Sequence, residues 1–175
     1  MDTFINEQID IKSLPVVEDL IFQPLEKKYL TVLLIGRVIL VFVLIAHFIA
    51  GIFWFGSEVP QYFAYLAIFL FLMLVVLLFV STLKGFSHKR YALRQNDIVF
   101  KTGWLWKDMT TIPFNRVQHV SIDQGPIERN FTLAKLKIYT AGGSSSDLII
   151  PGIHPQTAET LKEFITSKTP SYEEE

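Results

Sequence analysis

The uncharged stretch Tyr62–Val80 limits what this chain can fold into more than any other feature. It runs for 19 residues without a charged residue, Pro, Gly, Asn or Gln. A helix of this length extends roughly 28 Å, which is close to the hydrocarbon thickness of a bilayer. A protein of 175 residues has no interior large enough to bury a helix that is apolar on every face. We therefore predict a transmembrane helix over about 62–83, not the core helix of a soluble domain.

A second apolar block, Tyr29–Phe55, precedes this stretch and contains Arg37 and His47. Because a charged side chain at the bilayer centre costs about 3 kcal/mol, we expect the hydrocarbon-spanning part to begin near Val38. Arg37 would then reach back to the headgroups. His47 lies near the middle of the membrane in this register and is a functional candidate. The simpler interpretation is a neutral imidazole that hydrogen-bonds to a carbonyl of the other helix.

The segment that joins the two blocks, 56–61, is long enough only for a tight turn and contains no Lys or Arg. Basic residues instead flank the open end of the hairpin: Lys27, Lys28, Lys84, Lys89, Arg90 and Arg94. Because cytoplasmic loops carry the excess of Lys and Arg, we expect both termini in the cytoplasm and the turn outside. Residues 1–28 are acidic and polar, so a cytoplasmic segment is expected there and not a cleavable signal peptide.

After Leu83 the apolar pattern gives way to the alternation of a small β-rich domain, expected over 84–168. Short strands are expected at 91–93, 98–101, 109–113, 117–123, 136–140 and 148–150, with a hairpin tip at 102–108 and a loop at 124–132. Pro155 suits the first position of a helix capped by His154. The apolar residues of this helix form one stripe that can cover an open end of a sheet: Ala158, Leu161, Phe164 and Ile165. Residues 169–175 form an acidic tail.

Three segments occur in order behind the two-helix hairpin: Ile112–Val120 (IPFNRVQHV), Gln124–Phe131 (QGPIERNF) and Leu136–Gly142 (LKIYTAG). In these segments the chain resembles the bacterial pleckstrin-homology (PH) domain family of YdbS-like membrane proteins. The resemblance implies a PH-like β-barrel of about seven antiparallel strands, closed by one C-terminal α-helix, at the inner face of a bacterial cytoplasmic membrane. It also implies a complex with a larger PH-repeat membrane protein, because family members often occur beside such a relative.

The sequence offers little for catalysis. It contains no Cys, which excludes disulfides, thiolate chemistry and Cys-based metal sites. No two of its four His residues have the i, i+4 spacing of a helical metal site: His47, His88, His119 and His154. A nucleophile elbow and a phosphate-binding loop are also missing. We therefore expect no catalytic residue, no metal, no cofactor and no enzymatic activity.

The charge is unevenly distributed, although the net charge is only −1. Residues 84–168 carry twelve bases and seven acids, and a basic domain directly after a span is attracted to anionic lipid headgroups. The candidate membrane-surface bases are Lys84, Lys89, Arg90 and Arg94; the same bases also account for the topology. The loop 95–97 between the first two strands contains no base, so headgroup-specific recognition is not expected. Nucleic acid binding is not expected either, because a lipid surface explains the charge.

Trp104 and Trp106 flank Leu105 at the expected hairpin tip. Because they are two residues apart, their side chains would lie on the same face of a strand. The favoured interpretation buries at least one Trp in the barrel. The alternative is an aromatic patch that contacts lipid or a partner protein. Arg116 and Arg129 lie in the family segments and are candidates for a domain–domain interface. Pairing of either Arg within the domain, with Asp123 or Glu128, is an equally good account.

These observations favour a non-enzymatic, membrane-anchored interaction or scaffold module. It would assemble with copies of itself or with the larger PH-repeat relative, in support of envelope integrity or export. A second hypothesis is a small transporter or transport accessory subunit that uses Arg37 and His47 and must oligomerise to enclose a path. A third is a module that binds anionic lipid nonspecifically.

Overall fold

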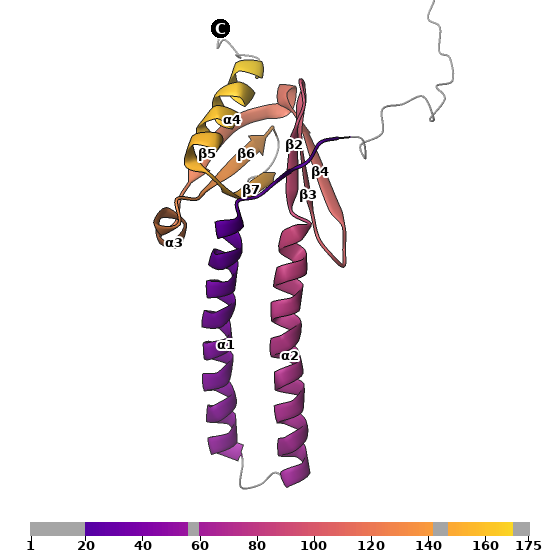
Figure 1. The fold of residues 1–175 in the computed structure, drawn as a ribbon, viewed down its shortest axis with the longest axis vertical. Helices are drawn as coiled ribbons and strands as arrows, with labels where there is room; N and C mark the ends of the chain where they lie inside the picture. Colours follow the sequence, from indigo (N-terminus) through magenta and orange to yellow (C-terminus); the bar gives the residue numbers. More distant parts are fainter. Residues whose placement is uncertain (1–19, 56–59, 142–146, 170–175) are drawn as a thin grey trace, which may run out of the picture.

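The computed structural model describes residues 20–55, 60–141 and 147–169. Two long helices run side by side and carry a small β-rich domain at one end (Figure 1). These helices, α1 (Lys27–Phe55) and α2 (Gln61–Ser87), are both long and apolar enough to cross a membrane. The two expected apolar helices are therefore present. The predicted segment before residue 20, most of the predicted turn and the acidic tail beyond Thr169 lie outside the described residues.

α1 is continuous from Lys27, so the segment before Val38 extends the helix. The position where the hydrocarbon layer begins stays a prediction. Phe48 and Phe71 stack between the two helices, with ring centroids 5.1 Å apart and an interplanar angle of 20°. Trp54 and Tyr62 are exposed at the turn end of the pair, as an aromatic belt at one interface requires.

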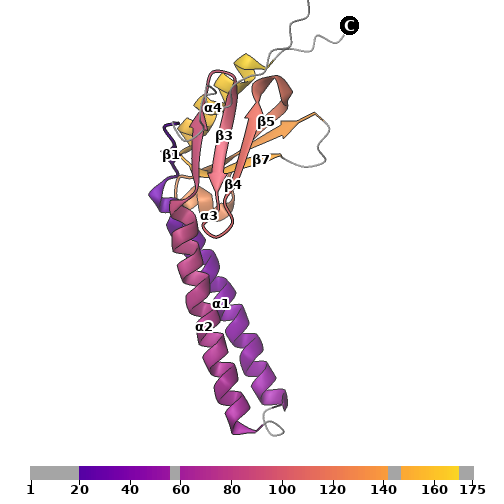
Figure 2. The ribbon, with the colours of Figure 1, turned by 90° about the vertical axis from the view of Figure 1, so that its right-hand side faces the viewer.

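The described residues of the domain form seven strands in two antiparallel sheets (Figure 2). The first sheet has the order β1 (Gln23–Pro24), β2 (Arg90–Leu93), β3 (Asp97–Thr102) and β4 (Asp108–Pro113). The second has the order β5 (Val117–Asp123), β6 (Ala134–Thr140) and β7 (Leu148–Ile153). No strand pairing among the described residues joins the two sheets. The number of strands agrees with the expectation, whereas closure into one barrel is not shown.

The C-terminal helix, α4 (Pro155–Lys168), packs on β5 and β6. Its first turn is capped as expected, because the His154 Nδ1 accepts a hydrogen bond of 3.3 Å from the Gln156 backbone N–H. Ala158 and Ile165 are fully buried in the predicted stripe, and Phe164 contacts Phe114 edge-on. The helix therefore completes the core between the two sheets.

Two features of the domain differ from the expectation. The predicted loop 124–132 contains a short helix, α3 (Pro126–Asn130), which is only five residues long and cannot show helical periodicity. The domain also begins before the membrane helices instead of at residue 84. Gln23–Pro24 supply the edge strand β1, and Leu25 and Tyr29 belong to the core. A two-residue strand is too short to produce an alternating pattern.

The junction between α1 and the domain depends on Gly152 of β7. The Glu26 backbone N–H donates a hydrogen bond of 2.9 Å to the Gly152 carbonyl. Gly152 has a φ of +63°, and a Cβ at this position would overlap the ring of Tyr29. The Tyr29 side chain thus packs directly on the backbone of β7, which holds the start of α1 against the second sheet.

Candidate membrane-surface site

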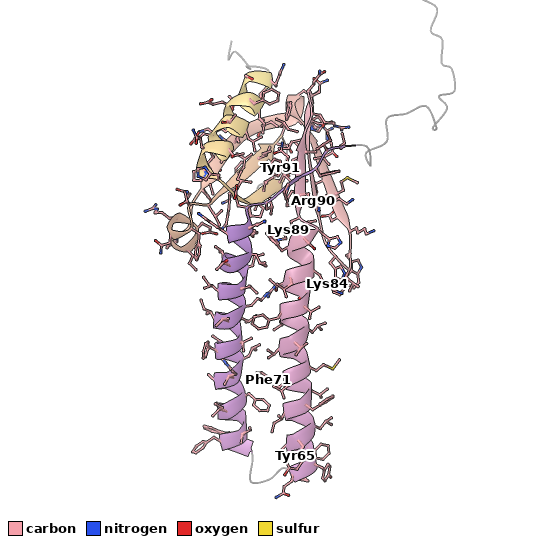
Figure 3. The ribbon with its side chains drawn as sticks, viewed as in Figure 1. Tyr65, Phe71, Lys84, Lys89, Arg90 and Tyr91 are labelled. Carbon is pink, nitrogen blue, oxygen red and sulfur yellow. The ribbon has the colours of Figure 1, made fainter. Side chains whose placement is uncertain are left out.

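Lys84 lies in the last turn of α2, at the end of the helix that joins the domain (Figure 3). Its Nζ is 4.5 Å from the ring centroid of Trp104, in the loop between β3 and β4. This is a cation–π contact. It brings together two candidates that the sequence placed 20 residues apart.

Lys89 faces the junction, not an open surface. Its Nζ is 5.9 Å from the ring centroid of Tyr29. Burial lowers the pKa of the Lys89 ammonium, and the charge of Arg37 lowers it further. Lys89 is thus half-buried at the junction and is not an open membrane-surface base as predicted.

Arg90 lies directly opposite Lys101 in the register of β2 and β3. Like charges at such positions repel each other, and neither side chain forms an ion pair with a described acid. The two bases and Ser87 and His88 line a surface hollow at the end of α2, together with Leu20 and Phe22. The sequence prediction missed Lys101, because only the strand register brings it beside Arg90.

Arg94 does not share this surface. It follows the last residue of β2, whereas Arg90 begins that strand at the α2 end. Its guanidinium forms a bidentate ion pair with Asp97, and the Nε–Oδ1 distance is 2.5 Å. The expectation of one cluster of four bases is therefore wrong: β2 separates Arg94 from Arg90, and Asp97 already neutralises its charge.

The tip of the β3–β4 hairpin contradicts the favoured interpretation of the two Trp residues. Trp104 is half-buried against Lys84, and Trp106 is 81% exposed. Neither belongs to the core of the domain. The physical reason is that the hairpin projects past the body of the domain, alongside α2 (Figure 1).

Arg116 and Arg129 are both exposed. The acids proposed as their partners within the domain pair with lysines instead. Glu128 accepts from Lys135 Nζ at 2.5 Å, and Asp123 pairs with Lys137 across β5 and β6. The intradomain explanation for the two arginines is therefore wrong. Arg129 lies in the last turn of α3, and α3 lies on the opposite side of the helix pair from the β3–β4 hairpin in Figure 1. The four interaction candidates therefore do not form one patch.

The two intramembrane polar candidates of α1, Arg37 and His47, both have hydrogen-bond partners. The Arg37 Nε donates to the Thr82 Oγ1 of α2 at 3.0 Å, and Thr82 is buried. His47 Nδ1 is 2.8 Å from the Val43 carbonyl oxygen of its own helix. The expected bond from His47 to the other helix is therefore wrong, because the ring nitrogen bonds the carbonyl of residue i−4 in its own helix.

Within the described ranges, no group of three or more His, Cys, Asp or Glu could hold a metal ion. The remaining histidines have structural neighbours. His88 Nδ1 is 2.7 Å from the Lys84 carbonyl oxygen, and His119 lies beside Tyr139 with ring centroids 5.5 Å apart. The arrangement offers basic and aromatic side chains at the end of two apolar helices, which is suited to contact with a membrane surface.

Comparison with known proteins agrees with this geometry. The profile of the bacterial PH domain family matches residues 13–169, which is most of the chain. The chain belongs to the bacterial PH domain family. The UPF0699 transmembrane protein YdbS of Bacillus subtilis (strain 168) is 32% identical over 77 residues, which cover 44% of this chain and 46% of that protein. The match thus spans about half the length of this relative. No solved structure matches the chain significantly.

The start of the family match supports the structural boundary of this bacterial PH domain. The match begins at residue 13, before α1. Strand β1 and the core residue Leu25 also precede α1. In this chain the helix pair is thus inserted between the first and second strands of the same sheet.

We expect the domain to lose stability in acid through Glu128. Its hydrogen bond with Lys135 holds the pKa of the Glu128 carboxyl below the ordinary value, against the opposing effect of burial. A carboxyl whose pKa is lower in the folded state stabilises the fold at any pH above its unfolded-state pKa of about 4.3. This stabilisation is lost as the pH falls through the folded-state pKa. Denaturant unfolding measured between about pH 6 and about pH 3 should therefore show a steeper fall in the free energy of unfolding for the wild type than for Glu128→Gln. Equal slopes would contradict the prediction.

We expect Arg37→Leu and His47→Leu to leave the helix pair intact. Thr82 keeps its own bond to the Leu78 carbonyl at 2.7 Å, so loss of the Arg37 bond leaves no buried donor unpaired. Interhelical hydrogen bonds in membranes are worth about 0.6 kcal/mol on average. Both variants should therefore insert and purify like the wild type. They should also melt at the wild-type temperature in a thermal-shift assay in detergent. A large loss of stability in either would show a polar role that these contacts do not explain.

Proposed function

We propose that this chain is a non-enzymatic, membrane-anchored interaction module that holds its domain in a fixed position at the membrane surface. The observation that carries the proposal is the junction of the domain with the helix pair. Chain segments before α1 and after α2 pair as β1 and β2, and Leu25 and Tyr29 pack in the core. Two connections with shared packing restrict rotation far more than one flexible linker would. A domain held in this way is suited to present a fixed surface to a partner.

The partner that we propose is a second copy of the chain or a larger membrane protein with repeated PH domains. Arg116 and Arg129 support this, because both are exposed and neither forms an ion pair with a described acid. Arginine is enriched at protein interfaces since its planar guanidinium pairs well with carboxylates. The complex would serve envelope integrity or export.

The test is the size and composition of the particle that gentle detergent extracts from the native membrane. We expect a particle larger than one chain, and we expect Arg116→Glu with Arg129→Glu to reduce it. Lys162→Glu, on the exposed face of α4, is the matched control and should leave the particle unchanged. A monomeric, partner-free wild-type particle would count decisively against the proposal.

We further propose that the protein spans the bacterial cytoplasmic membrane twice, with the domain on the cytoplasmic side. The support is the distribution of Lys and Arg, which flank the domain end of the helices and are missing from the turn 56–61. A cysteine introduced at Ser57 should react with a membrane-impermeant thiol reagent in intact cells. A cysteine at Ser167 of α4 should react only after the cells are opened, and the reverse pattern would reject this orientation.

A second candidate function is binding of anionic lipid at the hollow that Arg90 and Lys101 line. The facing pair of bases favours it, because a bound phosphate would relieve their repulsion. Charge removal by Arg90→Gln with Lys101→Gln should then weaken the retention of phosphatidylglycerol during purification. The matched control is Lys162→Gln with Lys168→Gln on α4. Equal retention in both double variants would reject the site.

A further inference from the structure

The tip of the β3–β4 hairpin, Gly103–Lys107, carries large apolar side chains that the domain does not bury. Leu105 is 69% exposed and Trp106 is 81% exposed. Adjacent large apolar side chains with this exposure mark a contact surface. The tip is not simply an unfilled part of the core, because the neighbouring strand β3 buries Ile98, Val99 and Phe100 in the ordinary way.

The contact with Lys84 shows where the tip lies along the membrane helix α2. Figure 1 shows the hairpin directed from the domain along α2, and Figure 3 shows Lys84 beside its tip. The Lys84 Nζ lies 4.5 Å from the Trp104 ring centroid. Lys84 is also the first charged residue after Tyr62 on α2. The tip therefore lies beside the end of the uncharged part of α2, where we expect this helix to leave the hydrocarbon layer.

The turn holds its side chains in a fixed direction. Gly103 has a φ of +90°, and a Cβ there would overlap the carbonyl of Trp106. Thr102 and Asp108 close the hairpin as a paired position of β3 and β4. Because the turn is already ordered by these contacts, little conformational entropy remains to be lost when the tip binds.

We propose that Leu105 and Trp106 insert into the interfacial layer of the leaflet in which α2 ends, as a third contact of the chain with the bilayer. The proposal rests on the placement of α1 and α2 in a membrane given above. Trp is enriched at the headgroup level because its ring is amphipathic. Lys84 and Lys107 flank the aromatic tip and meet the phosphates at the same depth. Lipid is the occupant that the geometry favours, since lipid already surrounds the adjacent helix at this depth.

Depth-dependent fluorescence quenching of the full chain in vesicles tests the proposal. The vesicles contain phosphatidylcholine and phosphatidylglycerol in a ratio of about three to one, which supplies the anionic surface. One variant, Trp54→Phe with Trp104→Phe, retains only Trp106. The reference variant, Trp104→Phe with Trp106→Phe, retains only Trp54 at the turn end of α1. Bromine atoms are placed on the acyl chains either near the carboxyl group or near the methyl end.

We expect the Trp106 emission to shift to shorter wavelength in vesicles and to be quenched more by shallow than by deep bromine. Adding Leu105→Asp to this variant should remove the quenching. The proposal would be overturned if bromine quenches Trp54 but not Trp106 and iodide in the buffer quenches Trp106. That result would leave the membrane anchor in place. Protection of Trp106 from both quenchers would overturn it in favour of a protein partner. If Trp54 is not quenched either, the membrane placement itself fails.

Discussion

Gly152→Ala is expected to break the junction between the domain and the helix pair. The φ of +63° is unfavourable for any residue with a Cβ, and the added methyl group would also overlap the Tyr29 ring. Backbone strain of this kind costs about 1–3 kcal/mol, and overpacking typically adds about 1–3 kcal/mol. The domain should therefore lose a large part of its stability, because a small domain has only about 5–15 kcal/mol in total. Thermal unfolding of the intact protein in detergent, followed by Trp fluorescence, measures the loss.

The matched control for this variant is Gly85→Ala. Gly85 lies within α2 and a Cβ there would meet nothing within 4 Å. Alanine is favoured over glycine inside a helix by roughly 0.5–1 kcal/mol, so the control should melt at the wild-type temperature or slightly higher. Should both variants melt alike, the close packing of Tyr29 on β7 would not be what holds the domain in place.

Phe114→Ala is the second change with a large expected effect. Phe114 is 2% exposed and its ring meets Phe164 of α4 edge-on, with a centroid distance of 5.9 Å. Removal of a buried Phe side chain typically costs about 3–5 kcal/mol. We expect α4 to detach from β5 and β6, while α1 and α2 remain inserted. Limited proteolysis in membranes should then cut within α4 in the variant and not in the wild type.

Ile149→Ala on β7 provides the comparison for Phe114→Ala. Ile149 is 42% exposed, so its truncation should cost less than about 1 kcal/mol and leave α4 protected. A variant that loses α4 but keeps its spans also separates two roles. If such a protein still assembles with its partner, the interface does not depend on α4.

The sequence by itself determined the features that depend on neighbouring residues. Hydrophobic length predicts α1 and α2, because a span needs only enough consecutive apolar residues. Alternation and turn chemistry predict β2 to β7, and Pro155 after His154 predicts the start of α4. The family resemblance was also visible in three short segments, and the match over 13–169 confirms it. Each of these features depends on residues close together in the chain, so it can be predicted without knowledge of the fold.

The tertiary structure decided which of these residues act together. Strand register places Lys101 opposite Arg90, while Asp97 removes Arg94 from the same surface. The projection of the β3–β4 hairpin along α2 exposes Trp106. A Trp at a hairpin tip has the same sequence pattern whether the tip folds into a core or extends past it. Contacts between residues far apart in the chain depend on packing, so the periodicity of the local sequence does not predict them.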